Sequence, residues 1–255
     1  MKIARYRTVD GTVAWGLLGD NGSARRLPAT PFDGLEPTGT VDTGFTLLAP
    51  AETPRIFGVG LNYVSHIAES GAETPKRPLI FMKPPTALAD PEQPIVYPKE
   101  GEHVDFEAEL TVVIGRTARR LSQDEALSAV LGYTCANDVS ERIIQAEEMG
   151  QGALVVCKGF DTFCPLGPVI ATDLDPTNLE LKGRVNGETR QSINTSDLLF
   201  SVAELVSYLS QAITLLPGDL ILTGTPHGVG PVQPGDVVEI ELEGVGILRN
   251  GVVAE

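Results

Sequence analysis

The sequence of 255 residues predicts a β-rich α+β fold with a small β domain at the N-terminus. Three observations lead to this prediction. Strand-like apolar runs outnumber the helical patterns along the chain. They do not alternate regularly with helices, as a doubly wound parallel sheet would require. The first fifty residues consist of short strand-like runs separated by turn signals.

Residues 1–50 predict the small β domain. The runs ARYRTVDG, TVAWGLLGDNG and SARRL are separated by Asp10-Gly11 and by Asp20-Asn21-Gly22, which are typical of hairpin turns. The segment that follows is rich in Pro, Gly and Thr, as connections between domains often are. We therefore expect a boundary near residues 48–54, which divides the chain into residues 1–50 and 51–255.

The second segment, residues 51–255, carries most of the predicted strands. Candidate strands are RIFGVG, LIFMK, residues 104–116, GYTCAND, GPVIAT, LKGRVNG, DLILTGT and VVEIELEG. Three helices are predicted. One begins at Ser122, where Glu125 completes a capping box, one covers DVSERIIQAEEMG, and one begins near Ser201 with Glu204.

Composition and charge exclude several classes of protein. Thirty-four acidic and nineteen basic residues give a net charge of −15, which argues against nucleic acid and anionic membranes as partners. No apolar run approaches the roughly 18 residues that span a bilayer, and the start MKIARYRTVDG lacks the apolar region of a signal peptide. The three cysteines show no CxxC spacing. We expect a globular cytoplasmic enzyme.

The stretch VDFEAELTVVIGR, residues 104–116, predicts a buried strand that carries two acidic residues. Side chains two residues apart in a strand share a face, so Glu107 and Glu109 point the same way, with Cα atoms about 6.5–7 Å apart. Buried carboxylates this close repel each other unless a cation compensates them. The alternative is an edge strand whose acidic face meets solvent.

A third carboxylate follows another predicted strand. Asp138 ends GYTCAND and precedes a predicted helix, so capping that helix is one role for its side chain. The other role is metal binding. Three carboxylates, two from a strand and one from a strand end, suit an oxygen-preferring ion such as Mg²⁺ or Mn²⁺ and leave positions for water and substrate.

Two further segments contain residues able to move protons or bind anions. In GLNYVSHIAESG, His66 and Glu69 are three apart and would be neighbours on a helical turn, as a general base and its orienting carboxylate are. Such pairs also arise by chance. Lys158 lies in the apolar stretch ALVVCKGFDTF, where it either reaches solvent or pairs with an anion; Lys83 in FMKPP poses the same choice.

These segments together resemble the fumarylacetoacetate hydrolase family over roughly residues 54–250. The resemblance is carried by GLNYVSHIAESG, IFMKP, VDFEAELTVVIG, NDVSERIIQ, KGFDTFCPLGP and LTGTPHGVG, in the order that the family shows. It implies a mixed β-sandwich roll, usually dimeric, so a homodimer is expected. The chain departs from the family just before Lys158, where GQGALVVC stands in place of polar or aromatic residues, which leaves pocket shape and substrate choice open.

The resemblance also implies a role for each candidate residue. Glu107, Glu109 and Asp138 match the ligands of a divalent metal, Mg²⁺ or Mn²⁺. His66 and Glu69 match a catalytic dyad on a lid, and Lys158 matches an active-site lysine that stabilises an enolate or alkoxide. The positions that contact substrate or support the site in the family are matched by Arg142, Gln145 and Thr225.

The implied reaction passes through the enolate of a 2-oxo acid. The short N-terminal domain resembles that of the smaller bacterial members, which favours isomerisation of 2-hydroxyhepta-2,4-diene-1,7-dioate or hydrolysis of an acylpyruvate. Decarboxylation or tautomerisation of oxaloacetate-like acids is the alternative within the family. A metal-dependent protein that binds a ligand without turnover is the alternative from another class, and the presence of the His66–Glu69 pair argues against it.

Overall fold

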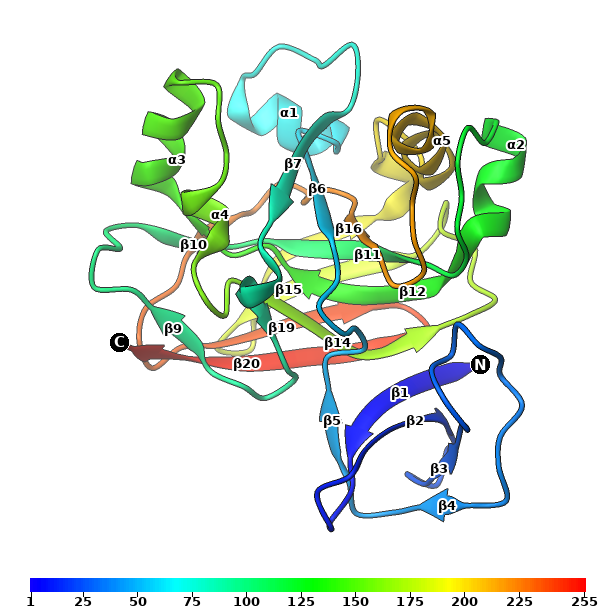
Figure 1. The fold of residues 1–255 in the computed structure, drawn as a ribbon. Helices are drawn as coiled ribbons and strands as arrows, with labels where there is room; N and C mark the ends of the chain where they lie inside the picture. Colours follow the sequence, from blue (N-terminus) through cyan, green and yellow to red (C-terminus); the bar gives the residue numbers. More distant parts are fainter.

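The computed structural model describes residues 1–255, which form a strand-rich α+β fold with mixed sheets, as the sequence predicts. The helices are α1 (Val64–Ser70), α2 (Gln123–Ala126), α3 (Arg142–Gly150), α4 (Val156–Gly159) and α5 (Val202–Ala212), and three 3₁₀ turns are η1 (Pro85–Ala87), η2 (Leu127–Ala129) and η3 (Thr195–Asp197). Figure 1 shows α1, α3, α5 and α2 gathered along one side of the sheets, with the N-terminal strands at the opposite end.

The largest sheet has twelve strands, of which ten run in the order β4-β3-β2-β1-β14-β12-β11-β17-β6-β7, with β5 paired to β1 and β8 to β14. Its strands are β1 (Lys2–Arg7), β2 (Val13–Leu18), β3 (Ala24–Arg26), β4 (Val41–Asp42), β5 (Thr46–Leu48), β6 (Ile56–Gly60), β7 (Leu79–Lys83), β8 (Leu88–Ala89), β11 (Ala108–Ile114), β12 (Val130–Asn137), β14 (Cys164–Ala171) and β17 (Leu220–Leu222). Only the β6–β17 and β8–β14 pairs are parallel. The strand β7 forms one edge.

Two smaller sheets complete the fold. A five-stranded sheet has the order β16-β15-β19-β20-β9 and a three-stranded sheet the order β13-β10-β18. Their strands are β9 (Ile95–Tyr97), β10 (Val104–Phe106), β13 (Ser140–Glu141), β15 (Glu180–Val185), β16 (Glu188–Asn194), β18 (Gly230–Pro231), β19 (Val237–Leu242) and β20 (Gly246–Ala254).

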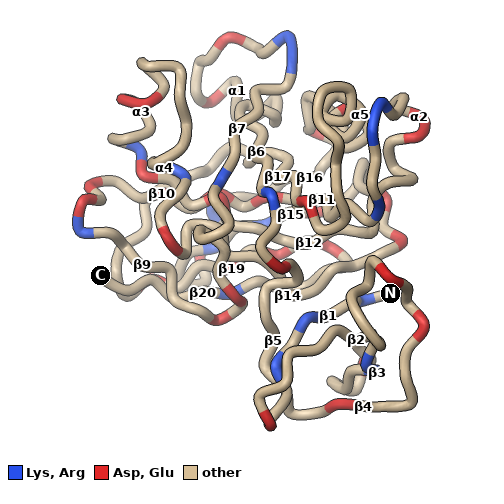
Figure 2. Tube along the Cα trace, viewed as in Figure 1, with Lys and Arg blue, Asp and Glu red and all other residues tan.

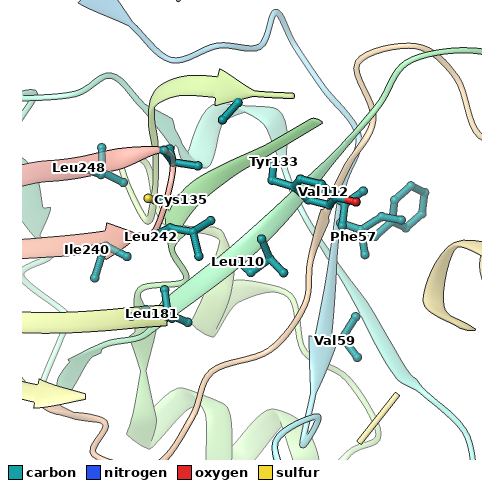
Figure 3. Close-up of a cluster of buried hydrophobic side chains, with 14 of the residues drawn as sticks. Phe57, Val59, Leu110, Val112, Tyr133, Cys135, Leu181, Ile240, Leu242 and Leu248 are labelled. Atoms are coloured by element: carbon teal, nitrogen blue, oxygen red, sulfur yellow. The ribbon is translucent and has the colours of Figure 1, made fainter. Parts of the chain in front are cut away.

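The main hydrophobic core of 38 buried residues includes side chains of the large sheet, of the five-stranded sheet and of α5. Figure 3 shows Leu110 and Val112 of β11 on one side of this core and Leu181, Ile240 and Leu242 of β15 and β19 on the other. Along β11 every residue from Ala108 to Ile114 is buried, because helices or sheets cover both of its faces. A buried central strand is therefore the element that presents Glu109.

The N-terminal strands extend the large sheet instead of forming a sheet of their own. The predicted hairpins are present, since β1 pairs with β2 and β2 with β3, both antiparallel. In addition β1 pairs with β14, with Lys2 opposite Ala171 and Ile3 opposite Ile170. No local pattern predicts this pairing, because it joins strands more than 160 residues apart.

Two predicted elements differ in their bounds. The run 104–116 is interrupted at Glu107, where β10 ends and β11 begins, and the two strands pair with different partners. The helix predicted from Asp138 begins only at Arg142, because Ser140 and Glu141 form the short strand β13. The capping role considered for Asp138 is taken by Glu141, whose side chain accepts a hydrogen bond from Ile144 N.

The two predicted capping boxes are confirmed. Ser122 with Glu125 caps α2, and Ser201 with Glu204 caps α5. None of the helices is both long enough and apolar enough to cross a lipid bilayer.

Candidate metal centre and active site

Three carboxylates meet where β10, β11 and β12 end or begin. Antiparallel pairing sets Ala108 of β11 opposite Asn137 of β12, so Asp138, directly after β12, lies beside Glu107. The amide of Asp138 donates to the carbonyl of Glu107 at 2.9 Å. One carboxylate oxygen from each of Glu107, Glu109 and Asp138 lies within 4.8 Å of the others. The topology therefore builds a cluster that the sequence shows only as separated residues.

All three carboxylates are buried. Their relative exposures are 5% for Glu107, 2% for Glu109 and 1% for Asp138. The alternative of an edge strand with a solvated acidic face is therefore wrong. In Figure 2 the acidic segments near the start of β11 lie close to the basic segments of β7 and α4.

Buried cations compensate two of the three carboxylates. Lys158 Nζ donates to Glu107 Oε2 and to Asp138 Oδ2, both at 2.8 Å. Lys83 Nζ donates to Asp138 Oδ1 at 2.5 Å, and Arg142 Nη2 lies 2.7 Å from Glu107 Oε1. Burial opposes the charged form of Glu107, but Lys158 and Arg142 outweigh it and hold the pKa of this carboxyl well below its usual range. Burial likewise opposes the charged form of Lys158, and its acidic partners raise its pKa above the usual range.

Glu109 has no cation. Its side chain accepts a single hydrogen bond, from Gly224 N at 2.7 Å. Burial, and then the nearby charges of Asp138 and Glu107, raise the pKa of Glu109 well above its ordinary value. Gly224 can approach this closely because it adopts φ +101° and has no Cβ, which would lie 2.9 Å from Cβ of Asn62.

The cluster fits a divalent metal ion such as Mg²⁺ or Mn²⁺. Such ions prefer carboxylate oxygens, and three ligands leave coordination positions free for water and substrate. The uncompensated charge of Glu109 is the structural sign that a cation belongs here. When all four carboxylates are ionised, as a bound cation favours, the site holds four negative and three positive charges, and a divalent ion would change its net charge from −1 to +1. These groups are Asp105, Glu107, Glu109, Asp138, Lys83, Lys158 and Arg142.

A cavity of about 300 Å³ opens over this cluster, and eight of the nine candidate residues line it. These are His66, Glu107, Glu109, Asp138, Arg142, Gln145, Lys158 and Thr225. The ninth, Glu69, does not line the cavity but contacts His66. The large sheet, α1 and α3 thus bring together residues spread over 160 positions of the chain.

The predicted helical turn that pairs His66 with Glu69 is present in α1. His66 Nδ1 lies 3.3 Å from Glu69 Oε2, and Gly228 N donates to both oxygens of Glu69 at 3.2 and 3.3 Å. Asn62, two residues before α1, is fully buried and bonds to Phe200 N, Phe200 O and Thr223 O. The contacts of Asn62 before the helix and of Gly228 with Glu69 within it therefore hold α1, and with it His66, in place beside the cavity.

The three candidate substrate contacts differ in the hydrogen-bonding capacity they have left. Arg142 Nε, Nη1 and Nη2 contact Asp105, Gln145 and Glu107 in turn. Gln145 accepts from Arg142 through Oε1, which leaves its amide N–H groups free to donate. Thr225 Oγ1 donates to Ala108 O and accepts from Gln191 Nε2, so most of its capacity is used within the protein.

Three supporting residues did not stand out in the sequence. Asp105 binds Arg142 Nε at 2.7 Å, and its place two residues before Glu107 in the alternating pattern was the available signal. Gln191 bonds to Ala108 N, Thr225 Oγ1 and Pro226 O from a distant strand, which no local pattern reveals. Glu148 accepts the amides of Val155, Val156 and Cys157 and so holds the start of α4, which carries Lys158.

Comparison with curated proteins finds relatives that cover most of the chain. Protein Rv2993c of Mycobacterium tuberculosis is 43% identical over 265 residues, which cover 99% of this chain and 98% of the relative. The mitochondrial oxaloacetate tautomerase FAHD2A of Bos taurus is 44% identical over 219 residues, which cover 82% of this chain and 69% of the tautomerase.

Solved structures with the same fold include two enzymes. The 5-carboxymethyl-2-hydroxymuconate delta-isomerase from Mycobacterium smegmatis superposes with a TM-score of 0.92 at 43% identity, over 100% of both chains. The fumarylpyruvate hydrolase from Pseudomonas aeruginosa, solved in complex with Mn²⁺ and pyruvate, gives a TM-score of 0.75 at 33% identity, covering 80% of this chain and 91% of that one.

Family comparison assigns both parts of the chain. Residues 1–50 match the family described as Rv2993c-like, N-terminal. Residues 55–253 match the family described as fumarylacetoacetate (FAA) hydrolase, C-terminal. The chain belongs to the fumarylacetoacetate hydrolase family.

Proposed function

We propose that the protein is a Mg²⁺- or Mn²⁺-dependent enzyme that acts on a 2-oxo acid, or on its 2-hydroxy-dienoic enol, through an enolate. The observation that carries the proposal is Glu109, a buried carboxylate without a cation, in a cluster that faces His66 across one cavity. A bound divalent ion would act as a Lewis acid toward the carboxylate and keto oxygens of the substrate. Glu107, Glu109 and Asp138 would hold it.

The residues of the chain supply the proton transfer. Because Nδ1 of His66 faces the carboxylate of Glu69, the neutral imidazole carries its proton on Nδ1 and presents Nε2 as the base. His66 lines the cavity, so this nitrogen is placed to take a proton from water or from the substrate. Glu69 would also stabilise the imidazolium that results.

Lys158 and Gln145 supply the remaining polar contacts. The ammonium of Lys158 contacts both Glu107 and Asp138, and it would stabilise negative charge that develops on a substrate oxygen beside them. The free amide N–H groups of Gln145 would donate to the substrate carboxylate. Helix α3, strand β7 and α1 contribute walls of the cavity.

Within this class we favour C–C hydrolysis or isomerisation in the breakdown of aromatic compounds. The support is the similarity along the whole chain to the delta-isomerase and, over most of it, to the fumarylpyruvate hydrolase. Tautomerisation or decarboxylation of an oxaloacetate-like acid is the second candidate, favoured by the 44% identity to the bovine oxaloacetate tautomerase.

The test is turnover of a defined panel by the metal-stripped and the reloaded protein. Acylpyruvates, 2-hydroxyhepta-2,4-diene-1,7-dioate and oxaloacetate are incubated with and without Mn²⁺ or Mg²⁺, and the products are identified by mass spectrometry. We expect turnover only with metal, and a loss of about 100-fold or more in kcat for His66→Gln. Turnover that is unchanged in the stripped protein would refute metal dependence, and metal-dependent binding of every compound without product would favour the ligand-binding alternative.

A further inference from the structure

The active-site cavity adjoins a second, apolar cavity. The second cavity has a volume of about 370 Å³, and eight of its nine lining residues are hydrophobic, the ninth being Gly152. Four residues line both cavities: Leu79, Phe81, Met149 and Leu154. The two cavities therefore adjoin each other, and the space that they span together, from the carboxylate cluster to the surface between β7 and the α3–α4 connection, is called the path below.

Strand β7 changes from charged to apolar along this path. Lys83, Phe81 and Leu79 are two residues apart and share a face, so they form a row about 13 Å long. Lys83 binds Asp138 at the inner end, and the ring of Phe81 lies 5.2 Å from Lys158 Nζ. Leu79, which is 41% exposed, lies at the outer end. The ring of Phe81 fits because its cross-strand neighbour is Gly58, where a Cβ would lie 2.2 Å from the ring.

Helix α3 shows the same change. Its first turn places Arg142 and Gln145 beside the carboxylates. Met149 comes seven residues after Arg142, about 10 Å further along the axis, and is 53% exposed. Leu154 follows in the connection to α4. Both walls thus leave apolar surface in contact with water at the outer end of the path.

The outer part of the path contains no cation. Lys158 and Arg142 are the only Lys or Arg residues that line the first cavity, both at the carboxylate end, and none lines the second. Lys76 and Arg77, in the connection between α1 and β7, are exposed and line neither cavity. A carboxylate at the outer end of a bound substrate would lose part of its hydration without gaining an ionic partner.

We propose that this site selects 2-oxo acids whose far end is an extended apolar tail, such as a medium-length acyl chain, over dicarboxylates of the same length. The proposal rests on the proposed function, because the head of the substrate is assigned to the carboxylate cluster. It narrows that function to acylpyruvate-like substrates with an alkyl or aryl end. Leu79, Met149 and Leu154 are the residues that determine this specificity.

The test is calorimetric binding of simple 2-oxo acids to the Mn²⁺-loaded full-length protein. The probes are 2-oxobutanoate, 2-oxohexanoate, 2-oxooctanoate and the dicarboxylate 2-oxoadipate, which matches 2-oxohexanoate in length. We expect affinity to rise about two- to fourfold per added methylene, and 2-oxoadipate to bind about tenfold or more weakly than 2-oxohexanoate. Equal affinity across chain lengths, or tighter binding of 2-oxoadipate, would overturn the proposal.

A charge placed at the outer end should reverse the selectivity. Leu154→Arg is expected to improve binding of 2-oxoadipate relative to 2-oxohexanoate by about tenfold, since the terminal carboxylate gains a partner. Val156→Arg is the matched control, because Val156 is 53% exposed two residues away and lines neither cavity; it should change neither affinity. If Leu154→Arg does not fold, Met149→Arg places a charge at the same outer end of the path and serves as the test.

Two other outcomes have distinct meanings. If Leu154→Arg changes the oligomeric state in light scattering and leaves the selectivity unaltered, the apolar surface is an interface between copies of the chain, and the proposal is wrong. If none of the probes, 2-oxobutanoate included, binds in the presence of Mn²⁺, the assignment of the 2-oxo acid head fails, and the proposed function fails with it. Binding of 2-oxobutanoate without any chain-length dependence refutes the apolar tail alone.

Discussion

Lys83 and Asp138 form a fully buried ion pair behind the candidate metal centre. Lys83 Nζ donates to Asp138 Oδ1 at 2.5 Å, while Lys158 Nζ donates to Oδ2 at 2.8 Å, so each oxygen of this carboxylate has its own cation. Lys158 lines the cavity and Lys83 does not. The Lys83 contact therefore fixes the orientation of Asp138 from outside the substrate space and can persist when a metal or substrate takes the other oxygen.

Replacing Lys83 should destabilise the protein strongly. Lys83→Met removes one member of a buried pair and leaves Asp138 partly uncompensated, for which we expect a loss of about 3–5 kcal/mol in the free energy of unfolding. Chemical denaturation of the metal-free protein measures this loss. Lys99→Met is the matched control, because Lys99 pairs with Glu255 at the surface, and it should leave the denaturation midpoint unchanged. Equal midpoints for the two variants would contradict the structural role of Lys83.

Substitution of two metal-ligand candidates should have opposite effects on the metal-free protein. Glu109→Gln replaces a buried carboxyl group that has no cation by a neutral amide that can still accept from Gly224, so we expect the metal-free variant to be at least as stable as the parent. Asp138→Asn leaves Lys83 and Lys158 without a shared anion and should lower the melting temperature.

Both variants should lose the stabilisation that Mn²⁺ confers, because a ligand that binds the folded state stabilises it by an amount that grows with the logarithm of its affinity. Thermal unfolding with and without Mn²⁺, over a range of concentrations, gives all four values in one experiment. A Glu109→Gln variant that melts well below the parent without metal, or that responds to Mn²⁺ as the parent does, would contradict the role assigned to Glu109.

Local patterns in the sequence were sufficient to predict the features that depend on neighbouring residues. The capping boxes at Ser122 and Ser201 and the helical turn that joins His66 to Glu69 are examples, because each is closed by residues three apart. Strand periodicity correctly placed the side chains of Glu107 and Glu109 in one cluster. The break in the strand at Glu107 escaped prediction, because it arises from pairing with β13 and β18, which are distant in sequence.

The parts of the site that the sequence could not reveal depend on tertiary contacts. Gln191 lies in the polar stretch ETRQSIN, which suggests an exposed strand. Its side chain is nevertheless fully buried and bonds to Ala108 N and Thr225 Oγ1. The sequence could not show whether Lys83 pairs with Asp138 or extends into solvent, since a lysine at the end of an apolar strand is compatible with both. The resemblance to a family implies roles for these residues, which remain predictions, and only the fold shows which buried carboxylates lack a cation.

Glu148 is expected to control the position of Lys158 without contacting the substrate. Its carboxylate accepts the amides of Val155 at 3.1 Å, Val156 at 2.8 Å and Cys157 at 3.0 Å, at the start of the short helix that carries Lys158. Glu148→Ala should increase hydrogen exchange of these three amides and lower kcat by about 10- to 100-fold, because small displacements of a catalytic group are costly.

Glu148→Gln keeps an acceptor oxygen and should lose less activity than the alanine variant. Glu147→Ala is the matched control, since Glu147 is exposed on the same helix and makes no hydrogen bond through its side chain. Fast exchange at residues 155–157 with unchanged kcat would show that α4 does not need this anchor to position Lys158.

Asp42 should make the stability of the N-terminal strands dependent on pH. Its carboxylate accepts from Tyr6 Oη at 2.6 Å and from Arg26 Nε and Nη2 at 2.8 and 2.6 Å, which ties β4 to β1 and β3. The hydrogen bond from Arg26 lowers the pKa of Asp42 in the folded protein.

A lowered folded pKa means that the contribution of Asp42 to stability is complete above the unfolded pKa of about 3.9 and disappears as the pH falls through the folded pKa. Asp42→Asn should therefore lower the melting temperature by about 2–4 °C at pH 7, and by progressively less below pH 4, whereas the exposed Asp20→Asn should match the parent throughout. A deficit for Asp42→Asn that stays constant from pH 7 to pH 3 would contradict this linkage.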